Sequence, residues 1–84
     1  MSYQVLITHQ AEKDIDLLTP KLRSKLQDIL TYVISINPHL GKKLHHDLKG
    51  NYSYRLTLKD RIIYSIDEKK KTVYIKRAKT HYGD

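Results

Sequence analysis

The sequence predicts an α+β domain in which two helices pack on one face of a mostly antiparallel sheet. Three observations lead to this prediction. The 84 residues suffice for one compact core, apolar residues repeat at strand spacing, then helical spacing, then strand spacing again, and turn residues separate these segments. The expected order is β-α-α-β-β-β, with an N-terminal strand, a helical hairpin and a three-stranded antiparallel meander, and we treat residues 1–84 as a single domain.

The first part of the chain predicts a strand and two helices. Apolar residues alternate over residues 3–7, which is typical of a strand, and Thr8 can cap a helix over about residues 10–18. Thr19-Pro20 begins the second helix, with threonine as the N-cap and proline at the first helical position. The apolar stripe of this helix continues until Asn37-Pro38 ends it.

The rest of the chain predicts the sheet. Residues 39–50 contain several histidines and two glycines and are expected to form a loop. Strands are expected at about residues 52–58, 61–66 and 72–77, because β-branched and aromatic residues alternate there with polar ones. The apolar stripes of the two helices need this sheet as a partner.

Strand alternation makes a sharper prediction about Arg55 and Arg61. Leu56 in one strand and Tyr64 in the next must share the buried face. This is satisfied if residues 58–60 form a three-residue connection between the strands. In that arrangement the two arginines lie together on the opposite, polar face of the sheet.

The charge of the chain is concentrated in its second half. The formal net charge is +7, yet residues 1–41 carry four Lys/Arg against four Asp/Glu, whereas residues 42–84 carry twelve against five. A basic half-domain favours a phosphate backbone, or an acidic protein surface, as the partner.

Several classes of protein are disfavoured by composition. The chain has no cysteine, which excludes disulfides and thiolate metal sites. Nothing resembles a signal peptide or a membrane span, so we expect a cytoplasmic protein with no membrane partner. The histidines show no helical i, i+4 pair and no supporting carboxylate cluster, so we expect no metal and no cofactor. These histidines are His9, His39, His45, His46 and His81.

The second half of the chain resembles the core signature of the RelE/ParE toxins. The matching segment is residues 43–56, KLHHDLKGNYSYRL, followed by Arg61-Ile62-Ile63-Tyr64. The shared pattern is a leucine, a glycine, a strand with basic residues, and then Arg-apolar-apolar-Tyr. The expected order of elements also matches that family, so the resemblance covers nearly the whole chain.

Two branches of that family are similar to this chain in different ways. The terminal His81-Tyr82 resembles the YoeB branch, and Arg55 and Arg61 fall on that branch's two functional arginines. The acidic general base of that branch falls at Lys42, so the chain departs from it there. The YafQ branch has histidines at the positions of His46 and His81, which makes this chain intermediate between the two.

The resemblance implies an endoribonuclease that works without metal and lets the RNA 2′-hydroxyl attack the scissile phosphate. The reaction needs a base, an acid, and cations for the charged phosphorane. Arg55 and Arg61 are the candidate phosphate clamp, because guanidinium offers a fixed charge and a planar fork of donors. His46 is the first candidate for the base. Its alternatives are His45 as the base, or no more than a solvated histidine in a loop.

The C-terminal pair completes the expected catalytic set. His81 is the candidate acid, and Tyr82 either stacks on a base or assists proton transfer. Further residues are expected to contact RNA around the scissile phosphate without cleaving it. These are His45, Lys49, Tyr74, Lys76, Arg77 and Lys79.

The expected partners are a cognate antitoxin, mRNA and the ribosome. The antitoxin is expected to be acidic and to cover the basic surface with a helix or an extended segment. A ParE-like toxin that binds DNA gyrase and cuts nothing is the rival hypothesis, and a toxin relic without catalysis is the third. His46 and His81-Tyr82 favour the nuclease, whereas the missing acidic base favours the relic.

Overall fold

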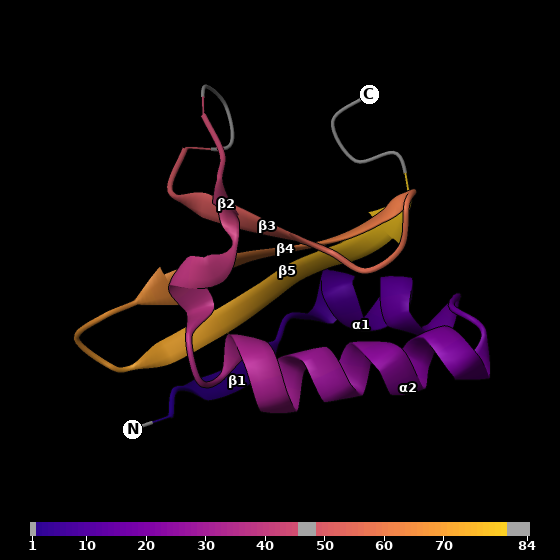
Figure 1. Ribbon diagram of the computed structural model, residues 1–84, viewed down its shortest axis with the longest axis horizontal. Helices are drawn as coiled ribbons and strands as arrows, with labels where there is room; N and C mark the ends of the chain where they lie inside the picture. The colour runs from indigo at the N-terminus through magenta and orange to yellow at the C-terminus, as the bar shows by residue number, and fades with distance from the viewer. Residues whose placement is uncertain (1, 46–48, 81–84) are drawn as a thin grey trace.

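The computed structural model describes residues 2–45 and 49–80, and it confirms the α+β class. Figure 1 shows a sheet with both helices on one side of it. The sheet has five strands in the order β1-β5-β4-β3-β2. The elements are β1 (Gln4–Ile7), α1 (His9–Asp16), α2 (Pro20–Ile29), η1 (Leu30–Ile34), η2 (Pro38–Leu40), β2 (Lys42–Lys43), β3 (Asn51–Arg55), β4 (Asp60–Asp67) and β5 (Thr72–Thr80). No helix among the described residues is long and apolar enough to span a membrane.

Both predicted helix starts are confirmed by their caps. The side chain of Thr8 accepts a hydrogen bond from the backbone of Ala11, and Thr19 does the same for Leu22. The first helix ends two residues earlier than expected. The second continues past α2 into the single π-helical turn η1, in which the Ser35 amide donates to the Leu30 carbonyl at 3.0 Å.

The expected meander is formed by β3, β4 and β5, which pair antiparallel in sequence order. Two further strands extend it. Strand β1 pairs parallel with β5, and the short β2 pairs antiparallel with β3. The prediction of a loop over residues 39–50 is therefore wrong at η2 and β2, because backbone hydrogen bonds to β3 order Lys42 and Lys43 despite their polar side chains.

The register of β3 and β4 keeps the predicted parity but shifts the connection. Arg55 pairs directly with Arg61, and the bend lies at residues 56–59 rather than 58–60. Thr57 explains the difference, since its hydroxyl accepts hydrogen bonds from the backbone amides of Lys59 and Asp60 at 3.1 and 2.9 Å. The same hydroxyl donates to the Asp60 carboxylate at 3.0 Å.

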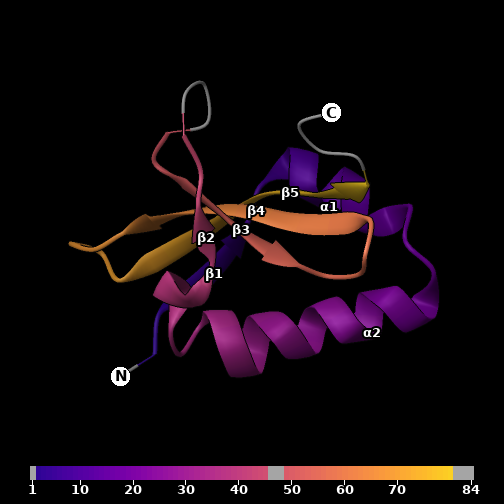
Figure 2. The same cartoon turned by 45° about the horizontal axis from the view of Figure 1, so that its top comes forward.

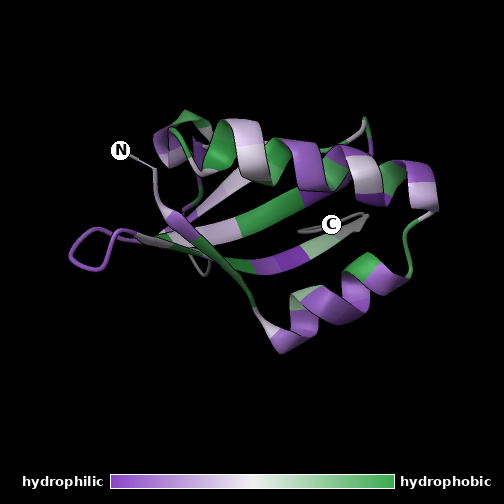
Figure 3. Ribbon diagram, turned by 90° about the horizontal axis from the view of Figure 1, so that it is seen from below, coloured by the Kyte–Doolittle hydropathy of each residue, from purple (hydrophilic) through white to green (hydrophobic). Residues whose placement is uncertain are grey.

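The core lies between the helices and the inner face of the sheet. Figure 2 shows α2 running beneath the strands, and Figure 3 shows apolar segments of the sheet facing the helices, with a hydrophilic β4–β5 turn outside. The buried cluster comprises Ala11, Leu26, Leu30, Ile34, Leu56, Ile62, Tyr64, Val73, Ile75 and Ala78. The arginines at positions 55 and 61 are thereby left on the face that the helices do not cover.

Tyr64 links the sheet to the segment before β2. Its hydroxyl donates to the Pro38 carbonyl at 2.6 Å, and its side chain is fully buried. Burial raises the pKa of Tyr64 to about 12, so the hydroxyl remains a donor at neutral pH. A side chain at position 41 would collide with this hydroxyl, which explains the glycine there. The contact therefore fixes where the chain enters β2.

The free edge of β5 beyond β1 is closed by helix α1. Asp14, which is 7% exposed, accepts a hydrogen bond from the Ala78 amide at 3.1 Å. It also binds Arg77, with Nε–Oδ2 and Nη2–Oδ1 distances of 2.8 and 3.2 Å. One carboxylate thus satisfies a backbone donor at the sheet edge and neutralises a cation.

The role of Asp14 can be measured by chemical denaturation. Asp14→Ala is expected to lower the free energy of unfolding by about 3 kcal/mol, because the Ala78 amide and the Arg77 guanidinium lose their acceptor. Asp16→Ala, at an exposed carboxylate of the same helix, is the matched control and should change it by about 0.5 kcal/mol or less. Equal effects of the two variants in urea titrations would contradict this account.

Candidate nucleic-acid interface

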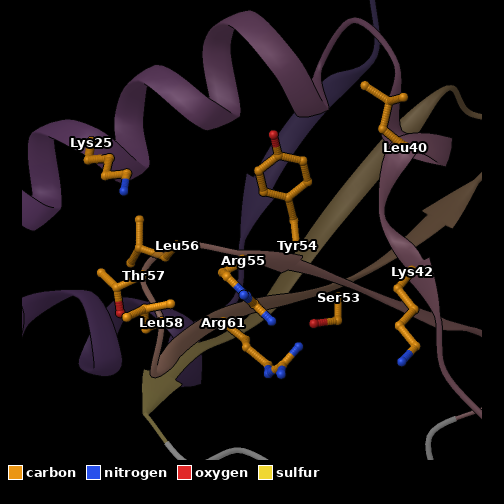
Figure 4. Close-up of a pocket in the computed structure, with 10 residues that line it drawn as sticks. All are labelled: Lys25, Leu40, Lys42, Ser53, Tyr54, Arg55, Leu56, Thr57, Leu58 and Arg61. Carbon is orange, nitrogen blue, oxygen red and sulfur yellow. The ribbon is translucent and has the colours of Figure 1, made fainter.

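Arg55 and Arg61 are direct cross-strand partners on the outer face of the sheet. Figure 4 shows both side chains extending to the same side, away from Tyr54, which points toward α2. Arg55 is exposed and Arg61 is half-buried. Neither guanidinium has an ion-pair partner among the described residues. Two like charges placed opposite each other destabilise a sheet, so this pair has no structural benefit to explain it.

The bend after β3 positions this pair. The amides of Leu56 and Thr57 both donate to the Asp60 carbonyl, at 2.9 and 3.1 Å. Leu56 is buried in the core, which anchors the end of β3 from the inner side. The two arginines therefore stand on strands whose relative position is fixed immediately beside them.

A groove of about 630 Å³ opens next to the arginines, along the edge of β3. Strand β2 pairs only with Tyr52 and Ser53, so the following residues of β3 have no strand on that side. Among the described residues, four cationic side chains and no carboxylate line the groove. The cations are Lys25, Lys42, Arg55 and Arg61 (Figure 4). The groove is therefore suited to an anion, and its open side admits a chain.

The histidines are separated from this groove in the part of the chain that the structure describes. The exposed His45 and Lys49 line a second cavity, of about 430 Å³, together with Tyr52 and Ile66. Parity places Tyr52 on the inner face of the sheet, on the side opposite to the arginines. The structure thus does not bring His45 and Lys49 together with Arg55. His46, His81 and Tyr82 lie outside the described residues.

Strand β5 carries the remaining expected RNA contacts. Tyr74 is half-buried opposite Ser65, and Lys76 is exposed at a bulge. The bulge adds one residue to β5, so that Ile63 pairs with Arg77 and Arg61 pairs with Lys79. The bulge therefore aligns Arg77 with the outer face, as the strand partner of Ile63. Its guanidinium, however, is bound by Asp14, which compensates its charge.

A separate ionic cluster occupies the β4–β5 turn. The carboxylate of Glu68 accepts hydrogen bonds from Tyr3 at 2.9 Å and Lys71 at 3.2 Å, and contacts the His39 ring at 2.6 Å. These contacts, with Tyr3 as the largest contributor, lower the pKa of Glu68, and Glu68 in turn raises the pKa of Lys71. The cluster ties the N-terminal segment to the turn and compensates the charge of Lys71.

Several residues of the groove are absent from the sequence-based site, among them Lys25, Lys42 and Ser53. From the sequence, Lys42 is only the position where an acidic base is missing, and Ser53 is only an outward-facing residue of its strand. The structure brings both to the groove as strand partners. Strand parity could have identified Ser53, since it lies two residues from Arg55, but Lys42 required the unforeseen strand β2.

No group of three or more potential metal ligands of the His, Cys, Asp or Glu type lies together within residues 2–45 and 49–80.

The sequence matches no known family model, and no curated protein matches it. The relationship of this chain to known proteins is therefore found by comparing its fold with solved structures.

Several solved structures similar to this one are complexes of a toxin with its antitoxin. A chain of the RelBE2 complex from Mycobacterium tuberculosis superimposes with a TM-score of 0.89 and 29% identity, over 96% of this chain and 93% of that chain. The YoeB–YefM complex from Staphylococcus aureus gives a TM-score of 0.78 and 26% identity, over 98% and 100%. The archaeal RelE–RelB complex from Pyrococcus horikoshii gives 0.70 and 27%, over the whole of both chains.

These similarities extend over nearly the full length of this chain and of its neighbours, and they agree with the family that the sequence resembles. By its fold and by these neighbours at 26–29% identity, the chain is a toxin of the RelE/ParE superfamily.

Proposed function

We propose that this chain is the toxin of a type II toxin–antitoxin system and an endoribonuclease that cleaves mRNA on the ribosome without a metal ion. The supporting observation is the pair Arg55 and Arg61, which has no carboxylate partner within residues 2–45 and 49–80 and lies beside an open groove that no carboxylate of those residues lines. A phosphate between the two guanidiniums supplies the missing negative charge. An RNA chain in the groove brings such phosphates in succession.

The proposed reaction uses the RNA itself as the nucleophile. The 2′-oxygen forms a bond to phosphorus, the bond from phosphorus to the 5′-oxygen breaks, and the products are a 2′,3′-cyclic phosphate and a 5′-hydroxyl. Arg55 and Arg61 donate hydrogen bonds to the non-bridging oxygens, on which negative charge grows in the phosphorane. Their contribution is therefore larger in the transition state than in the bound substrate.

Two proton transfers complete this reaction. A base takes the proton of the 2′-hydroxyl, and an acid gives a proton to the leaving 5′-oxygen. We assign these roles to His46 and His81, with Tyr82 stacking on a base or assisting the second transfer. His45 is the less favoured base, because it lines the other cavity.

The remaining expected RNA contacts become positioning contacts in this proposal. Tyr74, Lys76 and Lys79 belong to β5, the strand that pairs with β4, and Lys79 is the strand partner of Arg61. Arg77 is the weakest member of this set, because Asp14 already binds its guanidinium. Lys49 contacts RNA only if the bound RNA strand also passes the second cavity.

The proposed partner in the absence of mRNA is an acidic antitoxin. The formal net charge of +7 and the carboxylate-free groove favour an acidic segment that covers the arginine pair. Several structural neighbours are themselves complexes with their antitoxins, RelB or YefM. Binding of such a segment would block the same phosphate site and would keep the toxin inactive in the cytoplasm.

The first prediction uses the free energy of unfolding to distinguish Arg61, assigned to the phosphate site, from Arg77, assigned a structural role. Arg61→Gln is expected to raise the free energy of unfolding by about 0.5 kcal/mol, since it relieves the repulsion with Arg55. Arg77→Gln should lower it by about 2 kcal/mol, because the buried Asp14 loses its cation. A loss of about 1 kcal/mol or more in Arg61→Gln, measured by urea denaturation, would indicate a structural partner and contradict the assignment.

The second prediction concerns cleavage in cells. Expression of the wild type should create new mRNA 5′ ends, and Arg61→Ala should reduce their rate of formation by about a hundredfold or more, as expected for the loss of one transition-state donor. His81→Ala should also abolish most cleavage. Arg23→Ala, at an exposed arginine of α2, is the matched control and should cleave like the wild type.

The rival gyrase hypothesis predicts a different outcome of the same experiment. If the wild type creates no new 5′ ends and instead causes gyrase-linked breaks in DNA, the ribonuclease proposal is wrong. If the wild type arrests growth with neither effect, the catalytic assignment of Arg55 and Arg61 is equally wrong.

A further inference from the structure

Ser53 carries a buried hydroxyl that makes no hydrogen bond with any described residue. The residue is 5% exposed and lies in β3 at the floor of the arginine groove. Figure 4 shows its oxygen on the same side of the strand as the guanidinium of Arg55. Buried hydroxyl groups in native proteins nearly always have a partner, so an unpaired one at the wall of a groove is a donor that a bound ligand can satisfy.

The neighbours of Ser53 indicate the charge of this ligand. Its strand partner on one side is Lys42, and on the other side it is Ile63. Cross-strand partners project to the same face, so the lysine and the hydroxyl lie side by side. Lys42 is exposed and has no ion-pair partner in the described part of the chain. The pair thus offers one positive charge and one fixed donor, which suits an oxyanion.

The cross-strand row formed by Lys42, Ser53 and Ile63 is distinct from the row formed by Arg55 and Arg61. Ser53 and Arg55 are two residues apart in one strand, so the rows are separated by about 6.7 Å along β3. That separation is on the scale at which successive phosphates follow one another in a single strand of RNA. Arg77, at the far end of the Lys42 row, is compensated by Asp14 and adds little charge.

We propose that Lys42 and Ser53 form a second phosphate subsite, which binds the phosphate adjacent to the one held by Arg55 and Arg61. The inference rests on the proposed function, since it requires RNA in the groove. The Ser53 hydroxyl donates to a non-bridging oxygen, and the Lys42 ammonium supplies the charge. The two rows together fix the direction of the RNA along β3, so that only one phosphate meets the arginines.

The subsite is tested by binding rather than by cleavage. The probe is a short single-stranded RNA with 2′-O-methyl groups, which cannot cleave itself, spanning a cleavage site mapped with ordinary RNA. Ser53→Ala is expected to weaken binding about tenfold, as for a lost hydrogen bond to a charged group. Lys42→Gln should weaken it and reduce the slope of log affinity against log salt by about one. Fluorescence anisotropy at low ionic strength measures both.

Replacement of single phosphates by neutral methylphosphonates identifies the phosphate that Ser53 contacts. With the adjacent phosphate neutralised, Ser53→Ala should bind as well as the wild type, because the contact is already lost. With the scissile phosphate neutralised, the tenfold difference should persist. The opposite pattern, in which the difference disappears only with the scissile phosphate, would overturn the second subsite.

Stability provides an independent readout. Ser53→Ala removes an unpaired buried hydroxyl, so it should unfold at the same urea concentration as the wild type or a higher one. A lower midpoint would indicate a structural partner for the hydroxyl and overturn the proposal. Ser65→Ala, at a half-buried serine on the same face of β4, is the control and should leave RNA binding unchanged.

Failure of the subsite and failure of the proposed function are distinguishable. A wild type that binds and cleaves RNA, together with an unaffected Ser53→Ala, rules out the subsite alone. A wild type that neither binds the probe nor cleaves RNA rules out the ribonuclease proposal, and the subsite with it.

Discussion

The pairing of β3 with β4 is the constraint on which the rest of the structure depends. Side chains alternate along each strand, so one register places Leu56 and Tyr64 in the core and sets Arg55 opposite Arg61 outside. A slip of one residue would bury the arginines and expose the core, which is far more costly than any local gain. The bend closed by Thr57 holds this register at the end nearest the arginines.

Two cations of the sheet and its turn are held by carboxylates, whereas the cations at the groove are not. Arg77 and Lys71 have carboxylate partners, Asp14 and Glu68, and belong to the ties that hold the edge of β5 and its turn in place. The arginine pair and Lys42 have no such partner among the described residues and lie together at the groove. What sets these three cations apart is that they gather at one groove, which is suited to an anion. It also explains why the net charge alone could not locate the site.

The sequence was most informative where the physics is local. Threonine caps and helical spacing predicted both helix starts, and period-two alternation placed Arg55 and Arg61 on one face before their exact pairing was known. The family resemblance was confirmed by the fold comparison. The histidine assignments stay predictions, because His46 and His81 lie outside the described residues.

The features that sequence reasoning missed all depend on contacts between distant segments. The parallel pairing of β1 with β5 joins the two ends of the chain, and β2 has only two residues, both lysines, with no apolar alternation to signal a strand. The bulge at Lys76 reverses the parity of β5 without any glycine to mark it. The partnerships of Arg77 with Asp14 and of Ser53 with Lys42 follow from these pairings. None of them could be deduced from spacing along the chain.

The central claim is that Arg55 and Arg61 act as one unit on a single phosphate. The most direct measurement is the cleavage rate at one mRNA site for the wild type, Arg55→Gln, Arg61→Gln and the double variant. If both guanidiniums stabilise the same phosphorane, the double variant should be little slower than the slower single variant. Losses that multiply, so that the double variant shows the product of the two single effects, would show that the arginines act independently and would contradict the account.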